Sequence, residues 1–278
     1  MSLRRKKNNM PTVSILGCGW LGLPLAERLL AKGYAVNGST TTAEKLTVLT
    51  EKKINAFQIA LTEQEVTGNL QDFLANAEVL VIAIPPKLRA ATSAPFAGKL
   101  EILLPYLEQS PVKKVLFISS TAVYPDEVSY NKVTESYIPN PDTESGKQLL
   151  QAEKLLQNNP NFQTTVLRFG GLIGEDRHPV THLAGKENIA NPEAPVNLIH
   201  QEDCIGIILR ILETESWGEQ LNAVAPYHPA REAYYCKKAA EMQLPLPTFA
   251  HGKLSVGKII SSEKIQDVLH YSFRKTDF

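Results

Sequence analysis

The sequence contains little cysteine, no excess of charge of either sign, and no long apolar run. Its three cysteines, Cys18, Cys204 and Cys236, are few, odd in number and widely spaced. This pattern argues against a disulfide framework and a metal site, and it suits the reducing cytoplasm. Lys and Arg together number 29, as do Asp and Glu. A net charge of zero gives no electrostatic reason to expect nucleic acid or an anionic membrane as a partner. No stretch approaches the roughly 18 apolar residues of a spanning helix, so we expect no membrane partner.

A glycine motif stands near the start of the chain. Val13–Gly22 read V-S-I-L-G-C-G-W-L-G, and residues 23–32 have helical periodicity. The order strand, glycine turn, helix is the context in which G-x-G-x-x-G predicts dinucleotide binding. Gly17 permits the tight turn, Gly19 lets a pyrophosphate approach the backbone, and Gly22 lets the helix pack closely on its strand. The alternative is a turn with a purely structural role.

Apolar strands alternate with helical patterns over the first two-thirds of the chain. Continuous Val, Ile and Leu runs indicate strands buried on both faces of a parallel sheet. The alternation therefore predicts an α/β fold, a Rossmann-type doubly wound parallel sheet. The expected strands are 13–16, 35–38, 56–60, 79–84, 115–119, 165–169 and 196–199. The expected helices are 23–32, 43–51, 66–75, 95–109, 147–158, 203–213, 230–242 and 262–269.

The same pattern predicts how the chain is divided. We expect a disordered basic tail over residues 1–9 and a dinucleotide-binding domain over residues 10–176, to which residues 196–224 return. Residues 177–195 and 225–278, which include Pro-rich loop sequence, should form a small C-terminal substrate-binding lobe. Such lobes lie above the carboxyl edge of the sheet, where α/β sheets bind ligands.

The end of the second expected strand bears on the choice of cofactor. NAD-binding units carry an acidic residue about twenty positions beyond the glycine loop, which accepts the ribose hydroxyls. No carboxylate occupies positions 37–42. Ser39, Thr40 and Thr41 offer hydroxyl groups instead, and Lys45 follows one helical turn later. This set suits a 2′-phosphate and favours NADP, with NAD as the alternative. The hydroxyl run could also cap the next helix.

A further loop follows the fourth buried strand. It reads A-I-P-P at Ala83–Pro86. Small and proline residues at this place would let the adenosine half of a dinucleotide lie close to the backbone. A stiff loop without a ligand explains the same residues.

Four later segments carry a resemblance to a known family. They are V-L-F-I-S-S-T-A-V-Y-P-D from Val115, S-G-K-Q-L-L-Q-A-E-K-L-L from Ser145, T-V-L-R-F-G-G-L-I-G from Thr165, and N-L-I-H-Q-E-D-C from Asn197. With the glycine loop, they resemble the extended short-chain dehydrogenase/reductase superfamily, the NAD-dependent epimerase/dehydratase-like group. The resemblance spans nearly the whole chain. The opening G-C-G-W-L-G-L-P-L-A is also similar to β-hydroxyacid dehydrogenases, but the later segments speak against that group.

The resemblance places a catalytic serine but leaves the usual catalytic pair unfilled. It implies that Ser120 hydrogen-bonds the reacting oxygen of the substrate. The family pattern then requires Tyr-x-x-x-Lys on a helix, with a Glu four residues beyond the Lys. Aligned on Glu153, the Tyr position holds Ser145 and the Lys position holds Leu149. The chain therefore resembles an atypical subgroup that lacks the Tyr-x-x-x-Lys pair. A serine alcohol does not replace a phenolate without a base beside it.

Three tyrosines could supply the missing proton donor. Tyr124 follows the fifth strand at the expected carboxyl edge, and Tyr130 and Tyr137 lie in the next loop. Packing and surface positions are the alternative for all three. His200, in I-H-x-x-D, is expected to be structural. Arg168 is expected to support its strand, with ligand contact as the alternative.

These observations give two hypotheses of function. One is an atypical NADP-dependent oxidoreductase or epimerase that acts on a small polar metabolite or sugar nucleotide. The other is a non-catalytic NADP(H)-binding redox sensor or regulatory protein. The sequence leans toward the enzyme and is compatible with a homodimer. The candidate catalytic residues are Ser120 and Tyr124. The candidate cofactor residues are Gly17, Cys18, Gly19, Trp20, Leu21, Gly22, Ser39, Thr40, Thr41, Lys45, Ala83, Ile84, Pro85, Ser119, Phe169, Gly170 and Gly171.

Overall fold

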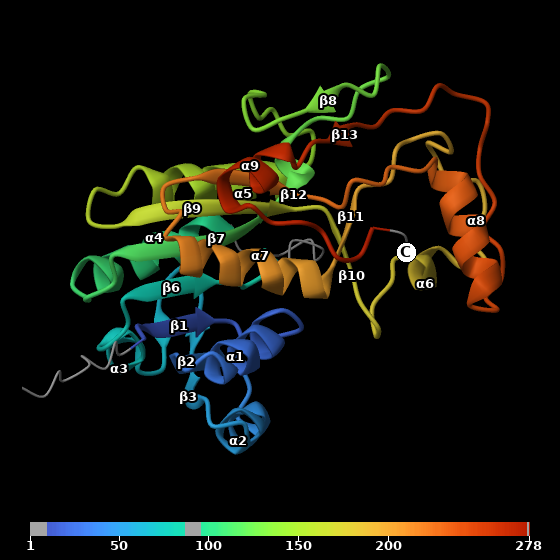
Figure 1. Ribbon diagram of the computed structural model, residues 1–278. Helices are drawn as coiled ribbons and strands as arrows, with labels where there is room; N and C mark the ends of the chain where they lie inside the picture. Colours follow the sequence, from blue (N-terminus) through green and yellow to red (C-terminus); the bar gives the residue numbers. More distant parts are fainter. Residues whose placement is uncertain (1–9, 87–95, 277) are drawn as a thin grey trace, which may run out of the picture. The chain divides into compact units, whose positions relative to one another are not determined.

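A seven-stranded parallel sheet runs through the fold, in the order β12-β9-β7-β6-β1-β2-β3 (Figure 1). The computed structural model describes residues 10–86, 96–276 and 278, so the expected tail over residues 1–9 lies outside the described residues. The strands of this sheet are β1 Thr12–Leu16, β2 Ala35–Thr40, β3 Asn55–Gln58, β6 Val79–Ile82, β7 Lys114–Ser120, β9 Gln163–Phe169 and β12 Gln220–Ala223. The predicted doubly wound α/β fold is confirmed.

The chain divides into two compact units. Unit 1 holds the chain up to Ile118 together with Leu155–Thr164, and unit 2 holds Ser119–Lys154 and Thr165–Phe278. These bounds differ from the domain division expected from the sequence, which remains a prediction. Each unit is described by itself below.

The helices of unit 1 cover both faces of its strands. Ser14 donates to the Phe73 carbonyl oxygen at 2.7 Å, and Asn37 donates to the same oxygen at 2.9 Å. Ser14 and Asn37 are register partners on β1 and β2, so α3 covers their face of the sheet. Successive residues of a strand point to opposite faces. Ile15 and Gly38 accordingly face the other side, where Gly38 packs on Leu49 of α2. The helices are α1 Gly22–Ala31, α2 Glu44–Glu51, α3 Leu70–Leu74 and α4 Phe96–Glu108.

One helix of unit 1 begins later than expected. The sequence predicted a helix from residue 66, but α3 starts at Leu70, after its N-cap Asn69. The residues before it form β5, Val66–Thr67, which pairs antiparallel with β4, Ala60–Leu61. Val and Thr are β-branched and favour strands. The Asn69 side chain accepts a hydrogen bond from the Asp72 N–H, which fixes the start of the helix.

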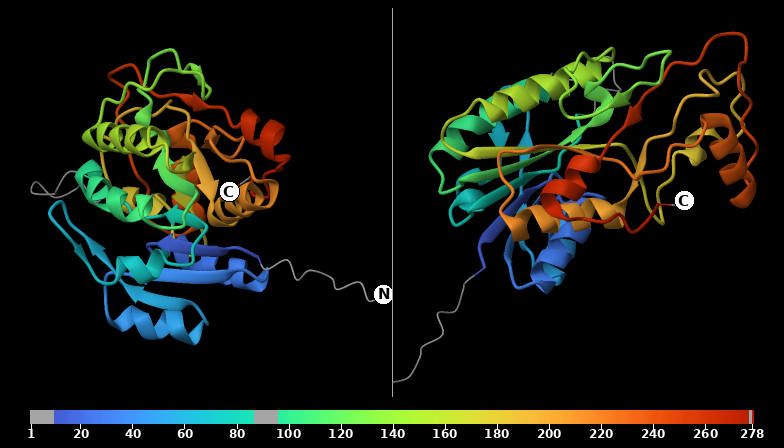
Figure 2. Two further views of the ribbon diagram at one scale, coloured as in Figure 1. Left: turned by 90° about the vertical axis from the view of Figure 1, so that its left-hand side faces the viewer. Right: turned by 45° about the horizontal axis from the view of Figure 1, so that its top comes forward.

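Unit 2 combines two strands of the main sheet with short ladders and helices. Its short strands pair in parallel, β8 (Lys132–Val133) with β13 (Ile259–Ile260) and β10 (Gly171–Ile173) with β11 (Leu198–His200). A small apolar core, which includes Val180, Tyr234 and Phe249, lies where α6 packs against α8 (Figures 1 and 2). The helices are α5 Glu144–Gln157, α6 Val180–Leu183, α7 Gln201–Thr214, α8 Arg231–Glu241 and α9 Glu263–Leu269.

Buried polar groups anchor the end of the chain to α7. The carboxylate of Asp203 is fully buried and accepts hydrogen bonds from the Tyr271 hydroxyl at 2.7 Å and the Arg274 N–H at 2.8 Å. His200 caps the same helix, because its Nδ1 accepts from the Glu202 N–H. The structural role expected for His200 is thus what the structure shows.

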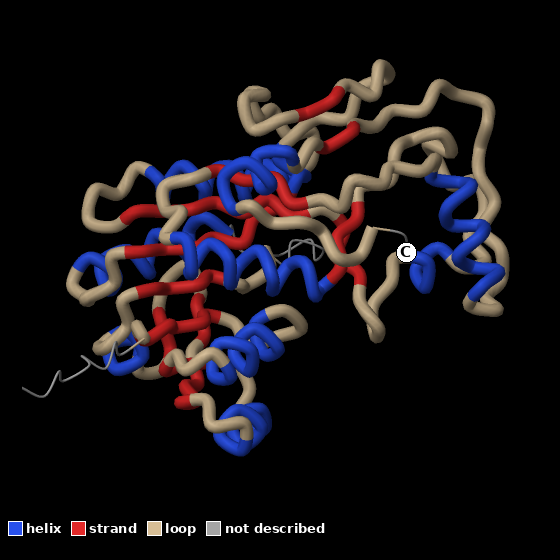
Figure 3. The backbone as a smooth tube through the Cα atoms, in the orientation of Figure 1, coloured by secondary structure: helices blue, strands red, loops and turns tan. Residues whose placement is uncertain are grey.

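Long loops separate the later elements of unit 2. Figure 3 shows that the segment between α8 and β13 is almost entirely loop. Within the described ranges, no helix has both the length and the apolar character that a bilayer crossing needs.

Candidate functional site

The glycine loop has the geometry that each of its glycines was expected to provide. Gly17 has φ +106°, a left-handed conformation that favours glycine. A Cβ at Gly22 would overlap the carbonyl oxygen of Gly17, so α1 can pack against the loop only with glycine there. A Cβ at Gly19 would meet nothing within 4 Å. Gly19 therefore presents bare backbone to open space at the start of α1, where a helix attracts phosphate.

Ser39 holds the glycine loop against β2. Its hydroxyl accepts a hydrogen bond from the Gly17 N–H at 2.9 Å, and its carbonyl oxygen accepts from the Cys18 N–H at 2.7 Å. The Cys18 thiol packs toward Gly38, and burial raises its pKa to about 12. Cys18 is consequently a neutral packing residue rather than a reactive thiolate. Ser39 is 2% exposed, so its first task is to position the loop.

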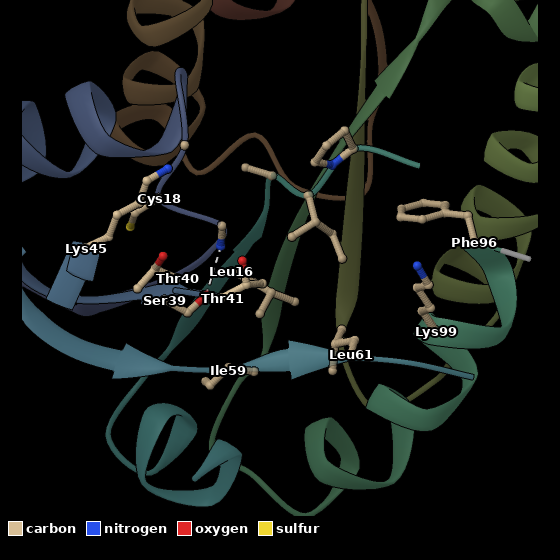
Figure 4. Close-up of a pocket in the computed structure, with 15 residues that line it drawn as sticks. Leu16, Cys18, Ser39, Thr40, Thr41, Lys45, Ile59, Leu61, Phe96 and Lys99 are labelled. Atoms are coloured by element: carbon tan, nitrogen blue, oxygen red, sulfur yellow. Dashed lines mark hydrogen bonds between the residues drawn. The ribbon is translucent and has the colours of Figure 1, made fainter. Parts of the chain in front are cut away.

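A cavity of about 280 Å³ opens beside this loop, wholly within unit 1 (Figure 4). In Figure 4, Lys45 lies near Cys18, and Lys99 lies near Phe96. The cavity is lined by Leu16, Gly17, Cys18, Gly19, Ser39, Thr40, Thr41, Lys45, Ile59, Leu61, Ala83, Ile84, Pro85, Phe96 and Lys99. Two lysines and no carboxylate stand among the described residues of this lining, so its fixed charge is positive.

The structure brings together most of the predicted cofactor residues. The glycine loop, the hydroxyl run with Lys45, and the Ala83–Pro85 loop, which are far apart in sequence, meet at this cavity. The hydroxyl run does not cap α2 through a side chain, since Ala43 occupies the N-cap without such a bond. Thr41 is exposed, so it is available to a ligand. The alternative that this run serves as a helix cap is therefore wrong.

Other predicted cofactor residues have different places. Leu21 is buried and Trp20 is half-buried beside the loop. Ser119, Phe169 and Gly171 belong to unit 2: the Ser119 hydroxyl donates to Glu153 at 2.6 Å, and Phe169 is buried. Gly170 packs so closely on residue 197 that a Cβ would lie 2.7 Å from its carbonyl oxygen. Cofactor contact by the residues of unit 2 remains a prediction.

The sequence reasoning missed one charged residue of the cavity. Lys99 lies on α4, more than fifty positions beyond Lys45. Ile59 and Leu61, which supply apolar wall on the β3 side, were also not expected. Hydrophobic periodicity identifies a helix or strand but not which of its residues face a cavity, so Lys99 carried no local signal.

Ser120 stands at the carboxyl end of β7. Its Oγ accepts a hydrogen bond from the Ala122 N–H at 3.2 Å and so caps a single 3₁₀ turn over Thr121–Val123. The hydroxyl proton is not used in that bond. Ser120 is partly exposed, and it can still donate to a ligand oxygen.

Tyr124 is built into the interior of unit 2. It is 1% exposed, and its hydroxyl accepts from Arg168 at 2.6 Å and donates to Asn222 at 3.0 Å. Burial raises the pKa of Tyr124, against the lowering effect of Arg168. Because both hydrogen-bonding functions of the phenol are satisfied away from solvent, the geometry supports the packing alternative over the proton donor.

Arg168 completes the buried network around Tyr124. Its guanidinium binds both carboxylate oxygens of Glu153, from Nε at 3.0 Å and from Nη2 at 2.5 Å. Both side chains are 1% exposed. A buried pair of this kind holds strands and helix in register but does not by itself indicate catalysis. The expectation that Arg168 supports its strand is confirmed.

The helix that should carry the Tyr-Lys pair is α5. Leu149 is 4% exposed and part of the core, and Ser145 is partly exposed one turn earlier. Lys147 is exposed. An apolar core residue thus stands at the usual lysine position, so the structure agrees with the atypical pattern.

A group of possible metal ligands was not expected from the sequence. Ligand atoms of Glu193, Glu232 and His251 lie within 4.8 Å of one another, with two of the three residues exposed. His251 Nε2 is 3.3 Å from a carboxylate oxygen of Glu232. A direct contact between the two side chains accounts for that distance without a metal.

Comparison with known proteins identifies the relatives of this chain. It is 34% identical over 270 residues to the protein YeeZ of Escherichia coli strain K12, a match that covers 96% of this chain and 97% of YeeZ. The chain belongs to the YeeZ family. A family model described as NADP oxidoreductase, coenzyme F420-dependent, matches residues 12–100, which lie in unit 1.

Solved structures show the same fold. A short-chain dehydrogenase/reductase superfamily protein from Agrobacterium tumefaciens with bound NAD has a TM-score of 0.77 and 18% identity, covering 95% of this chain and 93% of its own. A UDP-glucuronic acid 4-epimerase from Bacillus cereus, in complex with NAD, also has a TM-score of 0.77 and 18% identity, covering 95% and 94%. This family member thus has the fold of these short-chain dehydrogenase/reductase and epimerase structures. The family-model match and the glycine-loop cavity together indicate pyridine-nucleotide binding.

Proposed function

We propose that this protein is an NADP-dependent oxidoreductase or epimerase of atypical mechanism, acting on a small polar metabolite or sugar nucleotide. The observation that carries the choice of NADP is the charge of the unit 1 cavity. Lys45 and the exposed Thr41 stand at the end of β2, where NAD-binding units carry a carboxylate. A carboxylate would repel a 2′-phosphate, whereas an ammonium group and hydroxyls bind it.

The residues of the cavity fit the parts of the dinucleotide. The open backbone at Gly19 would receive the pyrophosphate, Lys45 and Thr41 the 2′-phosphate, and the apolar wall at Ile84 and Pro85 the adenosine. When bound, NADP supplies the capacity to accept or donate a hydride. The protein's part is to bind and orient the cofactor.

Ser120 is the residue that we propose for the substrate. Its free hydroxyl proton can form a hydrogen bond to a carbonyl or alcohol oxygen. Tyr124 is buried, and its hydroxyl already makes two hydrogen bonds, so it is not the acid of the proposed reaction. The sugar-nucleotide class is taken from solved structures with the same fold, one of which is a UDP-glucuronic acid 4-epimerase.

A binding experiment tests the cofactor. Trp20 lies in the glycine loop, so its fluorescence should fall when a dinucleotide binds, and Trp20→Phe should lose that change. We expect quenching by NADPH at lower concentration than by NADH. No response to either cofactor would remove the proposal, and a stronger response to NADH would reverse the preference.

A kinetic experiment tests for chemistry. Stopped-flow oxidation of bound NADPH should be followed against a panel of carbonyl compounds, with Ser120→Ala beside the wild type. We expect at least one compound to consume the cofactor, and the variant to react more slowly with unchanged NADPH affinity. Equal rates would show that Ser120 has no role in the reaction.

The second candidate function is a non-catalytic NADP(H) sensor. Ser145 and the buried Leu149 favour it, since they leave the usual catalytic pair unfilled. Tight NADPH binding with no consumption across the whole panel would support the sensor over the enzyme.

A further inference from the structure

A second cavity lies wholly within unit 2. Its volume is about 270 Å³, just below the roughly 300–1,000 Å³ of pockets for drug-sized ligands. Its wall includes residues 194–198 and Gly257 together with Arg231, Tyr235, Asn191, Lys258 and Asp126. The size suits a small metabolite, and the polar side chains decide its chemistry.

Arg231 is the main charge of this cavity. It is the first residue of α8, and its Nη1 donates to the Ala190 carbonyl oxygen at 3.2 Å. Across the described ranges, no carboxylate is paired with this guanidinium. A guanidinium has five N–H donors, so most of them stay available to a ligand. Its position at a helix N-terminus adds positive potential rather than offsetting it.

Tyr235 lies one helical turn beyond Arg231, on the same side of α8. It is 7% exposed, and its hydroxyl makes no hydrogen bond to a described residue. The hydroxyl oxygen is not fully enclosed, so it keeps accessible surface. Since Tyr235 also lines the cavity, its hydroxyl is placed to donate to a ligand there.

Asn191 and Lys258 add further donors to the same wall. The side-chain Oδ1 of Asn191 accepts from the Val256 N–H, which leaves the side-chain NH₂ for a ligand. Lys258 donates to the Tyr124 carbonyl oxygen and to Asp126, both at 2.8 Å. An ammonium group has three donors, so one remains. Asp126 neutralises the charge of Lys258, so the charge of Arg231 makes the net charge of the cavity wall positive.

We propose that the unit 2 cavity binds the oxyanion of a small acidic metabolite, a phosphate ester or a carboxylate, through Arg231 with Tyr235 and Asn191. This proposal rests on the proposed function, because it names the chemical class of the substrate of that function. It also narrows that class to molecules that carry an anionic group.

Isothermal titration calorimetry on the full chain tests the proposal. The probes are glucose 1-phosphate, L-malate and neutral glucose, each titrated with and without saturating NADP⁺ so that the unit 1 cavity is blocked in one arm. We expect glucose 1-phosphate or L-malate to bind, and the two probes separate a phosphate site from a carboxylate site. Glucose should show no heat.

Variants connect the binding to the cavity. Arg231→Met should lower the affinity for the probe that binds by about tenfold, and Tyr235→Phe, which keeps the ring, by about threefold. The matched control is Lys237→Met, on the same helix but 75% exposed, which should leave affinity unchanged. Circular dichroism and Trp20 quenching by NADPH check that each variant is folded.

Several results would overturn the inference. They are equal affinity for glucose and glucose 1-phosphate, an Arg231→Met variant that binds as well as the wild type, or no binding of either acid. All three leave the NADPH measurement intact, whereas failure of NADPH to quench Trp20 removes the proposed function and not the anion site.

Discussion

Replacement of Lys45 by Met should reveal which dinucleotide the unit 1 cavity prefers. The substitution removes one positive charge and keeps a side chain of similar length. Lys45 lines the cavity beside the end of β2 and is exposed to solvent. NADPH carries a 2′-phosphate that NADH lacks, so the substitution should weaken NADPH binding and leave NADH binding unchanged.

The magnitude follows from the exposure of the side chain. A hydrogen bond to a charged group contributes about 1.5–3 kcal/mol, and exposed ion pairs contribute about 0–1 kcal/mol. A lysine at the open edge of a cavity belongs near the boundary of these ranges, at about 1.4 kcal/mol. This corresponds to a roughly tenfold increase in the Kd for NADPH. Salt screens exposed charges, so the effect should shrink at high ionic strength.

The assay is Trp20 quenching by NADPH and NADH at low and high salt. Lys113→Met serves as control, since Lys113 is an exposed lysine of unit 1 that does not line the cavity. Lys99→Met shows whether the second lysine contributes to the same contact. An equal loss of affinity for NADPH and NADH in Lys45→Met would refute the argument. It would mean that Lys45 contacts a part of the cofactor that both dinucleotides contain, rather than the 2′-phosphate.

Further substitutions test the glycine loop, the buried ion pair and a half-buried imidazole. Gly19→Ala should weaken NADPH binding about tenfold at unchanged Tm, because its Cβ enters open space, whereas Gly22→Ala should cost about 1–3 kcal/mol of stability through overlap with the loop. Arg168→Met should destabilise the fold by about 3–5 kcal/mol in urea unfolding, since it leaves Glu153 buried and unpaired, and Glu153→Gln in the same chain should restore part of the loss. His178 has a pKa lowered to about 4 by burial and by Lys238, below its ordinary 6.5. Between these two pH values the unfolded chain therefore binds more protons than the folded chain, and the free energy of unfolding should fall as the pH drops from 6.5 toward 4. The fall should be less steep in His178→Gln. Equal slopes for the variant and the wild type would contradict this assignment.

Local patterns predicted much of the fold and part of the site. The buried runs of β1 and β6 and the glycine loop each carry their signal within a few residues, so their type was read correctly. The start of α3 at Leu70 was not, because pairing of β5 with β4 depends on a partner strand. Likewise β12 has the sequence Q-L-N-A, which alternates weakly and becomes a strand only beside β9.

The sequence by itself determined that a dinucleotide loop is present and that the catalytic Tyr and Lys positions hold Ser145 and Leu149. Residue identity at fixed spacing suffices for both. Only the tertiary structure decided that Tyr124 is buried against Arg168, and that Lys99 joins Lys45 around one cavity. It also decided that Arg231 and Tyr235 line a second cavity. These facts depend on which side chains from distant segments meet, and burial, hydrogen bonding and net cavity charge are properties of that meeting rather than of any local stretch.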